Sequence, residues 1–191
     1  SYRNPPWTLV TAHGLGFGIK HNPLIQIFPD PSLWERLGYR SANNGPLAFD
    51  QNVAIERDPA SIPDFFQKYL DPQESLQVGR FDDRPAQYDA VAKQIRHLVD
   101  NEELQLSDIL VVLPDTMSSR STSARIMTAL RNNGLQGHTP GVTSSRDLVF
   151  RDDAVAITHI HRAKGNEAPV VFVVDADYCE SSHESKKRRN V

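Results

Sequence analysis

The stretch Ala154-Val-Ala-Ile-Thr-His-Ile-His-Arg-Ala-Lys-Gly-Asn-Glu-Ala-Pro-Val-Val-Phe-Val-Val174 has the pattern of a strand, a polar loop and a second strand. Its two apolar runs, residues 154–158 and 169–174, are short and rich in β-branched side chains, which favour strands. Continuous apolar runs of this length are typical of strands buried on both faces, as in a parallel sheet. The loop between them gathers basic residues, histidines and a glutamate around one glycine, which makes it the first candidate for a functional site.

A third run of the same kind, Ile109-Leu-Val-Val-Leu113, lies between two amphipathic segments. The first segment begins at Pro85 and carries one apolar stripe, formed by Tyr88, Val91, Ile95, Leu98 and Val99. The second carries Ile126, Met127 and Leu130 and ends at Gly134, a natural C-terminal cap. Helices alternating with buried strands predict an α/β fold, with a mostly parallel sheet flanked by helices. Functional loops of such sheets follow the carboxyl ends of the strands, here Leu113 and Thr158.

Weaker patterns predict the remaining elements. A helix is expected from Asn4 and Pro5 to residues 16–18, and a second, short helix over residues 30–38. Strands are expected at residues 53–57, 76–78 and 148–150, with turn-rich loops at 39–52 and 134–147. A helix over residues 62–70, stopped by Pro72, is expected to turn three aromatic side chains inward: Phe65, Phe66 and Tyr69. The length suits one domain, so residues 1–191 are treated as one.

Composition narrows the class of protein. The 191 residues carry a net charge of −3, and 39% of them are hydrophobic. This charge excludes a protein that coats nucleic acid by overall electrostatics, so a nucleic-acid site must be a local patch. The single cysteine, Cys179, excludes an internal disulfide and favours a reducing, cytoplasmic location. No apolar run reaches the roughly 18–20 residues that span a bilayer, and the first residues lack the apolar core of a signal peptide. We therefore expect no membrane partner.

The loop after Thr158 contains the side chains best suited to bind phosphate, whether of a nucleotide or of a nucleic-acid backbone. Gly165 would allow the backbone to approach a ligand closely, and Glu167 could accept a hydrogen bond from a ribose hydroxyl or a positioned water. The basic and imidazole groups are His159, His161, Arg162 and Lys164. An ordinary charged surface turn is the alternative, and His159 alone is equally well explained as a surface or packed histidine. A metal site at the two histidines lacks further ligands.

The same stretch resembles motif V of the UvrD/Rep-type superfamily 1 helicases, whose pattern is roughly T-x-H-x-A-K-G-L-E-[FW]-x-x-V. Asn166 stands where the family has leucine, and Ala168 where it has an aromatic residue. The resemblance implies a RecA-like second motor domain. It places Thr158, His161 and Lys164 on the single-stranded nucleic acid, and Gly165 and Glu167 at the ATP site. The residues that fall on the pattern are His161, Ala163, Lys164, Gly165, Glu167, Val170 and Val171.

The first residues, Ser1-Tyr-Arg-Asn-Pro-Pro-Trp7, resemble the N-Y-R-S-T motif of that family and the helix after it. The resemblance implies that Tyr2 packs near the adenine. It also implies that Arg3 reaches the γ-phosphate and acts as a catalytic residue, an arrangement known from arginine fingers. Without the resemblance, Tyr2-Arg-Asn-Pro5 could equally be the start of a helix.

The segment Ile109–Arg120 is similar to the family's V-L-x-R-x-N-x-Q-S-R segment, whose loop contacts the DNA backbone. Asp115 replaces its first arginine, and Arg120 is displaced by one position. The resemblance implies nucleic-acid contacts from Thr116, Ser119 and Arg120, and Ser118 is a further possible donor to phosphate. Hydroxyl groups that cap the start of the next helix explain the same residues as well.

Several family features do not occur in the sequence. It has no Walker A or Walker B motif, so ATP and Mg²⁺ are expected only in a parent protein whose first motor domain, a partner of this one, supplies them. The isolated chain should not hydrolyse ATP. The family's last motif, T-R-A, is absent before Val191, and residues 134–154 are too few to hold a large 2B insertion. The first residues are interpreted as a boundary within a longer polypeptide.

Rival interpretations remain open. The chain could be a non-catalytic nucleic-acid-binding or partner-docking domain that keeps the RecA-like fold, which the changes at Asn166 and Ala168 permit. A small phosphotransferase or nuclease is disfavoured, because no set of carboxylates is clustered. Asp175 and Asp177 are interpreted as solvated residues at a strand end rather than as a metal pair, and the basic run 186–189 as a solvated surface. DNA is favoured over RNA as the single strand.

Overall fold

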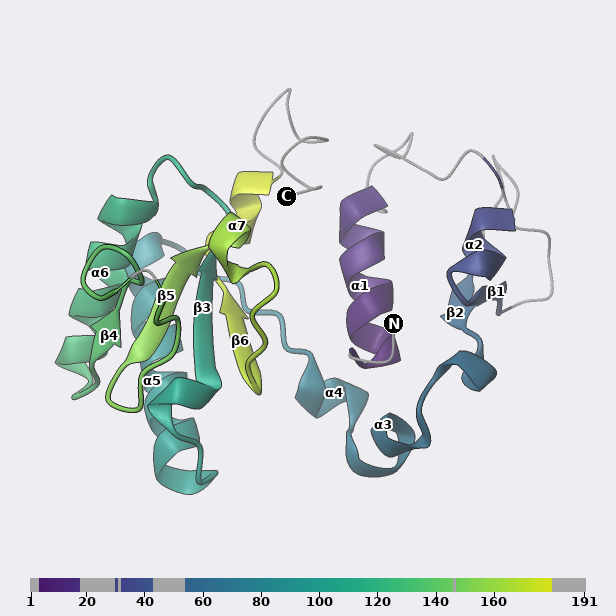
Figure 1. Cartoon of the computed structure of the whole chain (residues 1–191), viewed down its shortest axis with the longest axis horizontal. Coiled ribbons are helices and arrows are strands. Elements are labelled where there is room, and N and C mark those ends of the chain that lie inside the picture. Colours follow the sequence, from purple (N-terminus) through teal and green to yellow (C-terminus); the bar gives the residue numbers. More distant parts are fainter. Residues whose placement is uncertain (1–3, 18–29, 31, 43–53, 146, 180–191) are drawn as a thin grey trace. The chain divides into compact units, whose positions relative to one another are not determined.

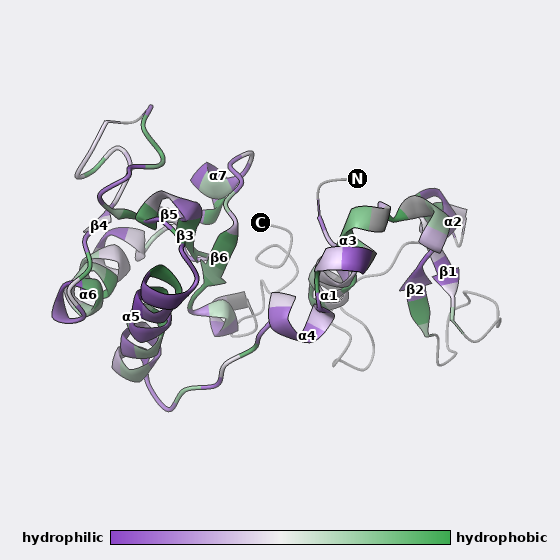
Figure 2. Cartoon of the chain, turned by 90° about the horizontal axis from the view of Figure 1, so that it is seen from below, coloured by the Kyte–Doolittle hydropathy of each residue, from purple (hydrophilic) through white to green (hydrophobic). Residues whose placement is uncertain are grey.

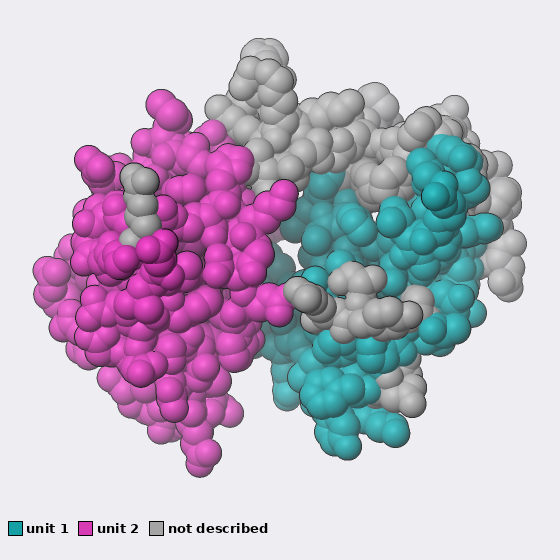
Figure 3. Space-filling view, viewed as in Figure 1, with its two compact units in different colours: residues 1–79, 190 teal, residues 80–189, 191 magenta. Residues whose placement is uncertain are grey.

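The computed structural model describes residues 4–17, 30, 32–42, 54–145 and 147–179. The chain divides into two compact units, Ser1–Gly79 and Arg80–Arg189 (Figure 3). The second unit carries the sheet and the loops of interest, so it is described first.

Two long helices frame the second unit. Helix α5, Arg84–Asn101, begins where the Asp83 side chain accepts a hydrogen bond from the backbone N–H of Ala86 at 2.8 Å, and Pro85 occupies its first turn. Helix α6, Ser119–Asn132, ends at Asn133 and is followed by Gly134, whose φ of 72° is the left-handed conformation that glycine adopts readily. The apolar stripe of α5 is buried as predicted, which confirms the helical periodicity of that segment.

Four parallel strands form the sheet, in the order β4-β5-β3-β6: β4 is Gly137–His138, β5 Val155–His159, β3 Ile109–Leu113 and β6 Val170–Val173 (Figure 1). Register pairs Val111 with Ile157 on one side and with Phe172 on the other. The structure thus confirms the predicted α/β class, with helices flanking a parallel sheet as in a RecA-like fold. The carboxyl ends of the strands share one edge.

The two faces of the sheet are covered differently. One face packs on α5 and α6, with Ile95, Ile126 and Leu130 fully buried against Val111 and Ile157. On the other face, Leu110, Val112 and Ala156 are buried beneath partly buried residues of three neighbouring segments: Phe150, Ile160, Ala163 and Ala168. The central strand β3 is therefore buried on both faces, as its continuous apolar sequence predicts.

The last strand differs from the prediction of a buried strand. β6 is hydrophobic throughout, seen as green in Figure 2, yet Val171 is 48% exposed and Val173 56% exposed. Both side chains alternate with Val170 and Phe172, which pack into the α5 and α6 core. Val171 and Val173 pair with Leu110 and Val112 and so lie on the same face of the sheet, but the described cluster that covers those residues does not extend to β6, which is an edge strand among the described residues.

Two further strand predictions are wrong, one in each unit, and two loops of the second unit contain more structure than predicted. Residues 76–78 and 148–150 form no strand. The turn-rich segment 134–147 contains the two-residue strand β4, which pairs with β5. The polar loop after β5 opens with one helical turn, α7, Ile160–Ala163. Short 3-10 turns complete the unit, η2 at Leu106–Asp108 before β3 and η3 at Ala176–Cys179 after β6.

The first unit contains helices α1 (Pro6–Phe17), α2 (Ser32–Arg36), α3 (Asp64–Tyr69) and α4 (Pro72–Ser75), a 3-10 turn η1 (Pro59–Ser61), and strands β1 (Tyr39–Ser41) and β2 (Ile55–Arg57). Its small core joins Trp34 and Tyr39 to Val10 and Ile55. The Arg57 guanidinium lies 5.0 Å from the centre of the Tyr39 ring, a cation–π contact.

Within this unit, helices α1 and α2 and strand β2 confirm the predicted elements. Strand β1 arises in a segment predicted to be a loop, because pairing with β2 supplies its hydrogen bonds. The inward orientation is wrong for Phe65, which is 59% exposed, and for Tyr69, which is 70% exposed, whereas Phe66 is half-buried. Pro72 begins α4, and α3 already ends at Tyr69.

Candidate functional site

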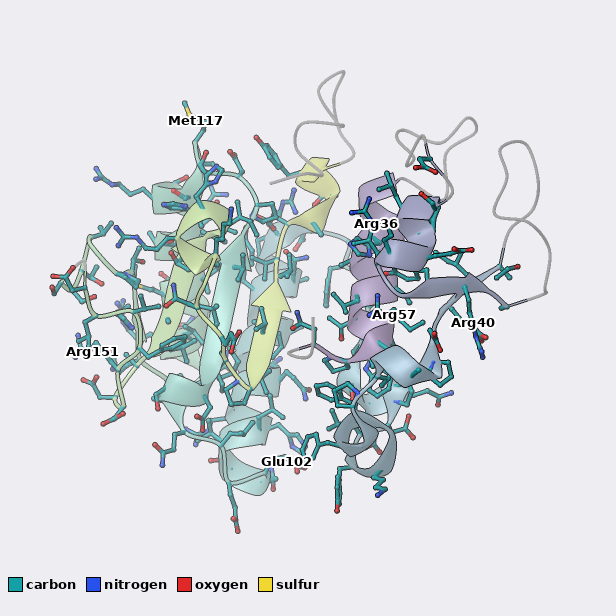
Figure 4. All side chains as sticks on the ribbon, turned by 45° about the vertical axis from the view of Figure 1, so that its right-hand side comes forward. Arg36, Arg40, Arg57, Glu102, Met117 and Arg151 are labelled. Atoms are coloured by element: carbon teal, nitrogen blue, oxygen red, sulfur yellow. The ribbon has the colours of Figure 1, made fainter. Side chains whose placement is uncertain are left out.

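Three segments meet the carboxyl edge of the parallel sheet: residues 114–118 after β3, 160–169 after β5 and 174–179 after β6. The N-terminus of α5 joins them through the contacts of Arg84 and Tyr88 with Asp175. Figure 4 shows Met117, on the loop after β3, at the opposite end of this unit from Glu102, which follows α5. The predicted site loops after Leu113 and Thr158 therefore lie at one edge, as the fold class requires.

The loop after β5 contains a tight turn that requires its glycine. Lys164 has φ −55° and ψ 122°, Gly165 has φ 87°, and the N–H of Asn166 donates to the carbonyl of Ala163 at 2.9 Å. These values define a type II turn, whose third residue needs a positive φ. No described atom lies within 4 Å of a Cβ placed on Gly165. Within the described structure, backbone conformation rather than crowding accounts for the glycine.

Two side chains fasten this turn to the rest of the unit. The Asn166 amide donates to the carbonyl of Arg162 at 2.9 Å, and the Arg162 guanidinium donates to the carbonyl of Pro140 in the loop after β4. Asn166 stands where the helicase pattern has leucine, and the amide gives this position a hydrogen bond that leucine cannot make. The departure from the pattern thus supports the loop instead of weakening it.

The structure places the sequence-predicted residues of this loop in two environments. His161, Lys164, Gly165 and Glu167 are exposed at the edge. Thr158, also predicted to contact nucleic acid, is 2% exposed within β5. The exposed set therefore offers an imidazole, an ammonium and a carboxylate to a ligand.

His159 is half-buried, and its Nδ1 has no hydrogen-bond partner among the described residues. Burial, assisted by the nearby Arg162 and His161, lowers the pKa of His159 from 6.5. Its ring centre lies 6.1 Å from that of His161, in an edge-to-face arrangement.

Asp115 organises the loop after β3. Its carboxylate accepts hydrogen bonds from the N–H of Met117 at 2.9 Å, the N–H of Ser118 at 3.3 Å and the Ser118 hydroxyl at 2.6 Å. Burial alone would raise the pKa of Asp115, but the hydrogen bonds from Ser118, Met117 and Tyr178 outweigh it and lower the pKa below 3.8. An aspartate in place of the family's arginine thus shapes this loop from within.

The three predicted nucleic-acid contacts of that loop lie at the start of α6. Thr116 and Arg120 are exposed, and the Ser119 hydroxyl donates to the carbonyl of Thr116 at 2.8 Å. The alternative of hydroxyl caps fits the structure less well, because Ser118 occupies the N-cap position without a side-chain capping bond.

The segment after β6 agrees with its interpretation as solvated only at Asp177, since the side chain of Asp177 is 66% exposed and that of Asp175 14% exposed. Arg84 donates to Asp175 at 2.8 Å and makes two bonds with Asp177, at 2.6 and 2.8 Å. Tyr88, 3% exposed, donates its hydroxyl to Asp175 at 2.7 Å. Burial, followed by that hydrogen bond, raises the pKa of Tyr88 to about 12. The described residues hold no group of three or more side chains suited to a metal ion.

Sequence reasoning did not single out Arg84. One signal was available: a cation in the first turn of a helix opposes the helix dipole, so it needs a nearby anion. Tyr2 and Arg3, predicted to bind nucleotide, lie outside the described residues, and so does the basic run 186–189. Glu167 has at least one interaction within the molecule.

Residues 153–191 match the family model of the UvrD-like helicase C-terminal domain. Among the described elements this match covers β5, α7, β6 and η3, the segment on which the resemblance to these helicases rests. No curated protein and no solved structure matches the chain. The match supports a UvrD-like helicase C-terminal domain and a helicase-related function. No helix in the described part of the chain combines the length and apolar character needed to cross a membrane.

Proposed function

We propose that the chain is the second motor domain of an ATP-dependent UvrD-like helicase, without a large 2B insertion, and that both of its compact units belong to that domain. The observation that carries the proposal is the family match over β5, α7 and β6, whose connecting loop lies at the carboxyl edge of a parallel sheet. Ligands of open α/β sheets bind at that edge.

The nucleotide half of the site takes its residues from two parts of the chain. Glu167 and the turn at Gly165 face ATP held by a first motor domain, which supplies the phosphate-binding loop and the Mg²⁺ ligands. Tyr2 packs near the adenine, and Arg3 stabilises charge on the transferred phosphoryl group. An arginine in that role contributes a factor on the order of 10³–10⁵ in rate.

The residues proposed to bind the nucleic-acid strand are the ones whose side chains are open to solvent. Lys164 and His161 are exposed on the loop after β5, and Thr116 and Arg120 are exposed at the start of α6. These two loops follow neighbouring strands, since β3 pairs directly with β5. Together they offer cations and hydroxyl donors to successive phosphates of a single strand, with DNA favoured over RNA.

Binding to a labelled single-stranded oligonucleotide tests the strand half. Lys164→Ala should weaken binding and lower the salt slope of log K by about 0.7, the value for one phosphate contact on a single strand. Lys93→Ala is the matched control, because Lys93 is an exposed lysine on α5 that pairs with Asp89. Equal effects of the two substitutions would contradict a phosphate contact by Lys164.

Hydrolysis of ATP tests the nucleotide half. The isolated chain should show negligible turnover, and robust hydrolysis by the purified chain would overturn the proposal. In a polypeptide that carries both motor domains, Arg3→Ala should abolish most turnover while the affinity for ATP changes much less, since the arginine acts on the transition state. Unchanged turnover in that variant would leave the domain as a nucleic-acid-binding or docking module.

A further inference from the structure

Arg84 occupies an unfavourable place for a cation. It is the first residue of α5, where the helix dipole repels positive charge. Its guanidinium nevertheless makes three bonds of 2.6–2.8 Å to two carboxylates that lie 91 and 93 residues further along the chain. Arginine suits this geometry because its planar fork engages one carboxylate with two parallel bonds and can still reach a second.

The partner, Asp175, is held in an uncommon conformation. Its φ is 56°, the left-handed region that residues other than glycine rarely adopt. Three contacts from α5 hold Asp175 in this conformation. Arg84 and the Tyr88 hydroxyl donate to the Asp175 carboxylate, and the Gln87 side-chain oxygen accepts from the backbone N–H of Asp175 at 3.1 Å. Aspartate tolerates this conformation better than most residues, so the number of contacts that hold Asp175 there is the reason to look for a function.

The same segment reaches the loop after β3. The N–H of Tyr178 donates to the carbonyl of Asp175 at 3.0 Å, so the turn at Asp175 places Tyr178. The Tyr178 hydroxyl in turn hydrogen-bonds Asp115, the carboxylate that shapes residues 115–118. A continuous chain of contacts therefore runs from Arg84 through Asp175 and Tyr178 to Asp115.

We infer that Arg84 is a positioning residue for strand binding: through Asp175, Tyr178 and Asp115 it sets the loop that presents Thr116, Ser119 and Arg120 to a single strand. This inference rests on the proposed function. Stability explains the bond to Asp177 poorly, because the side chains of Arg84 and Asp177 are 40% and 66% exposed, whereas Asp175, 14% exposed, also ties α5 to the end of β6. Ion pairs that exposed contribute little to folding.

Four single variants and one double variant test the inference. Arg84→Ala removes the guanidinium, and Tyr178→Phe removes only the hydroxyl that reaches Asp115. Arg96→Ala is the matched control, since it removes the same charge from the same helix, where Arg96 pairs with Asp100 outside the network. Arg84→Ala combined with Arg120→Ala, compared with Arg120→Ala alone, asks whether Arg84 acts through the loop.

Two measurements are made on each variant: affinity for a single-stranded oligonucleotide over a range of salt, and amide hydrogen exchange at Met117 and Ser118. We expect Arg84→Ala and Tyr178→Phe to bind about fivefold more weakly, as residues coupled in one network do. The salt slope should stay unchanged, whereas Arg120→Ala should lower it by about 0.7. The two amides should exchange faster, and Arg84→Ala should add little in the Arg120→Ala background. Arg96→Ala should match the unaltered chain.

The possible contrary results distinguish a failure of the Arg84 inference from a failure of the proposed function. If the unaltered chain binds but Arg84→Ala binds equally well, or if its effect adds fully to that of Arg120→Ala, the inference is wrong and the proposed function stands. A salt slope lowered by Arg84→Ala would make Arg84 a direct phosphate contact and would also overturn the inference. If the unaltered chain fails to bind a single strand, the proposed function fails first. Unchanged exchange at Met117 and Ser118 in Tyr178→Phe overturns the structural link without reference to nucleic acid.

Discussion

Replacing Gly165 by alanine tests the account of the loop after β5. The added Cβ meets no described atom within 4 Å, so the cost comes from the backbone alone. An L-residue held in the left-handed region costs about 1–2 kcal/mol. To reach a negative φ and keep the 2.9 Å bond from Asn166 to Ala163, the Lys164–Gly165 peptide would have to flip into a type I turn. We therefore expect Gly165→Ala to lower the free energy of unfolding by about 1–2 kcal/mol, and Gly165→Asn by less, because asparagine tolerates this conformation.

Urea denaturation followed by circular dichroism measures this change. With a slope of about 1–3 kcal/mol per molar urea, the unfolding midpoint should fall by about 0.3–2 M. Gly134→Ala is the matched control, since Gly134 has φ 72°, open space around it and a place at the end of α6. Both variants should lose similar stability, but only Gly165→Ala should also weaken single-strand binding, because its turn carries Lys164.

An unchanged midpoint for Gly165→Ala would refute the requirement for a positive φ. Equal loss of nucleic-acid affinity in Gly134→Ala would refute the claim that the turn presents the ligand-binding side chains. A fall in the slope of the transition instead of its midpoint would indicate a change in the denatured state, and would leave the backbone argument unsupported.

Three further predictions concern stability. Leu130→Ala removes a fully buried side chain from the α6 core and should cost about 2–5 kcal/mol in denaturant titration; a loss below about 1 kcal/mol would contradict the described packing. Asp83→Ala removes the side-chain cap of α5 and should lower the free energy of unfolding by about 0.5–2 kcal/mol, which would lower the denaturation midpoint. An unchanged midpoint would show that the cap does not stabilise the helix. Burial, and then the charge of Arg151, lower the pKa of His138 from 6.5. The buried neutral ring therefore contributes its full stability above pH 6.5, the unfolded pKa. That contribution is lost as the pH falls from 6.5 through the folded pKa. His138→Asn should therefore narrow the difference in unfolding free energy between pH 7.5 and pH 5, and an equal difference in both proteins would count against a neutral buried His138.

Local pattern was sufficient for the central elements of the second unit. The apolar stripe of α5 and the continuous apolar run of β3 are encoded over a few turns or residues, and both confirm the predictions. The same holds for the loop after β5, where the order of His161, Lys164, Gly165 and Glu167 along the chain is enough to indicate a functional loop. The assignment of nucleotide and nucleic-acid roles to these residues stays a prediction.

Local pattern misled where burial depends on a neighbour from elsewhere in the chain. Val171 and Val173 have the composition of buried residues, but β6 is an edge strand in the described sheet. Phe65 and Tyr69 follow helical spacing, yet the six residues of α3 are too short to bury a face without a partner surface.

The sequence by itself determined the two long helices α5 and α6 and the strands β3, β5 and β6 of the sheet unit, because hydrophobic periodicity acts over distances of one or two turns. It also marked the loop after β5 through its ordered motif. Only the tertiary structure decided the strand order, the edge position of β6 and the contacts of Arg84 with Asp175 and Asp177. Those depend on pairings between residues as far as 93 positions apart, which are chosen by how whole elements pack together and leave no periodic trace in the chain.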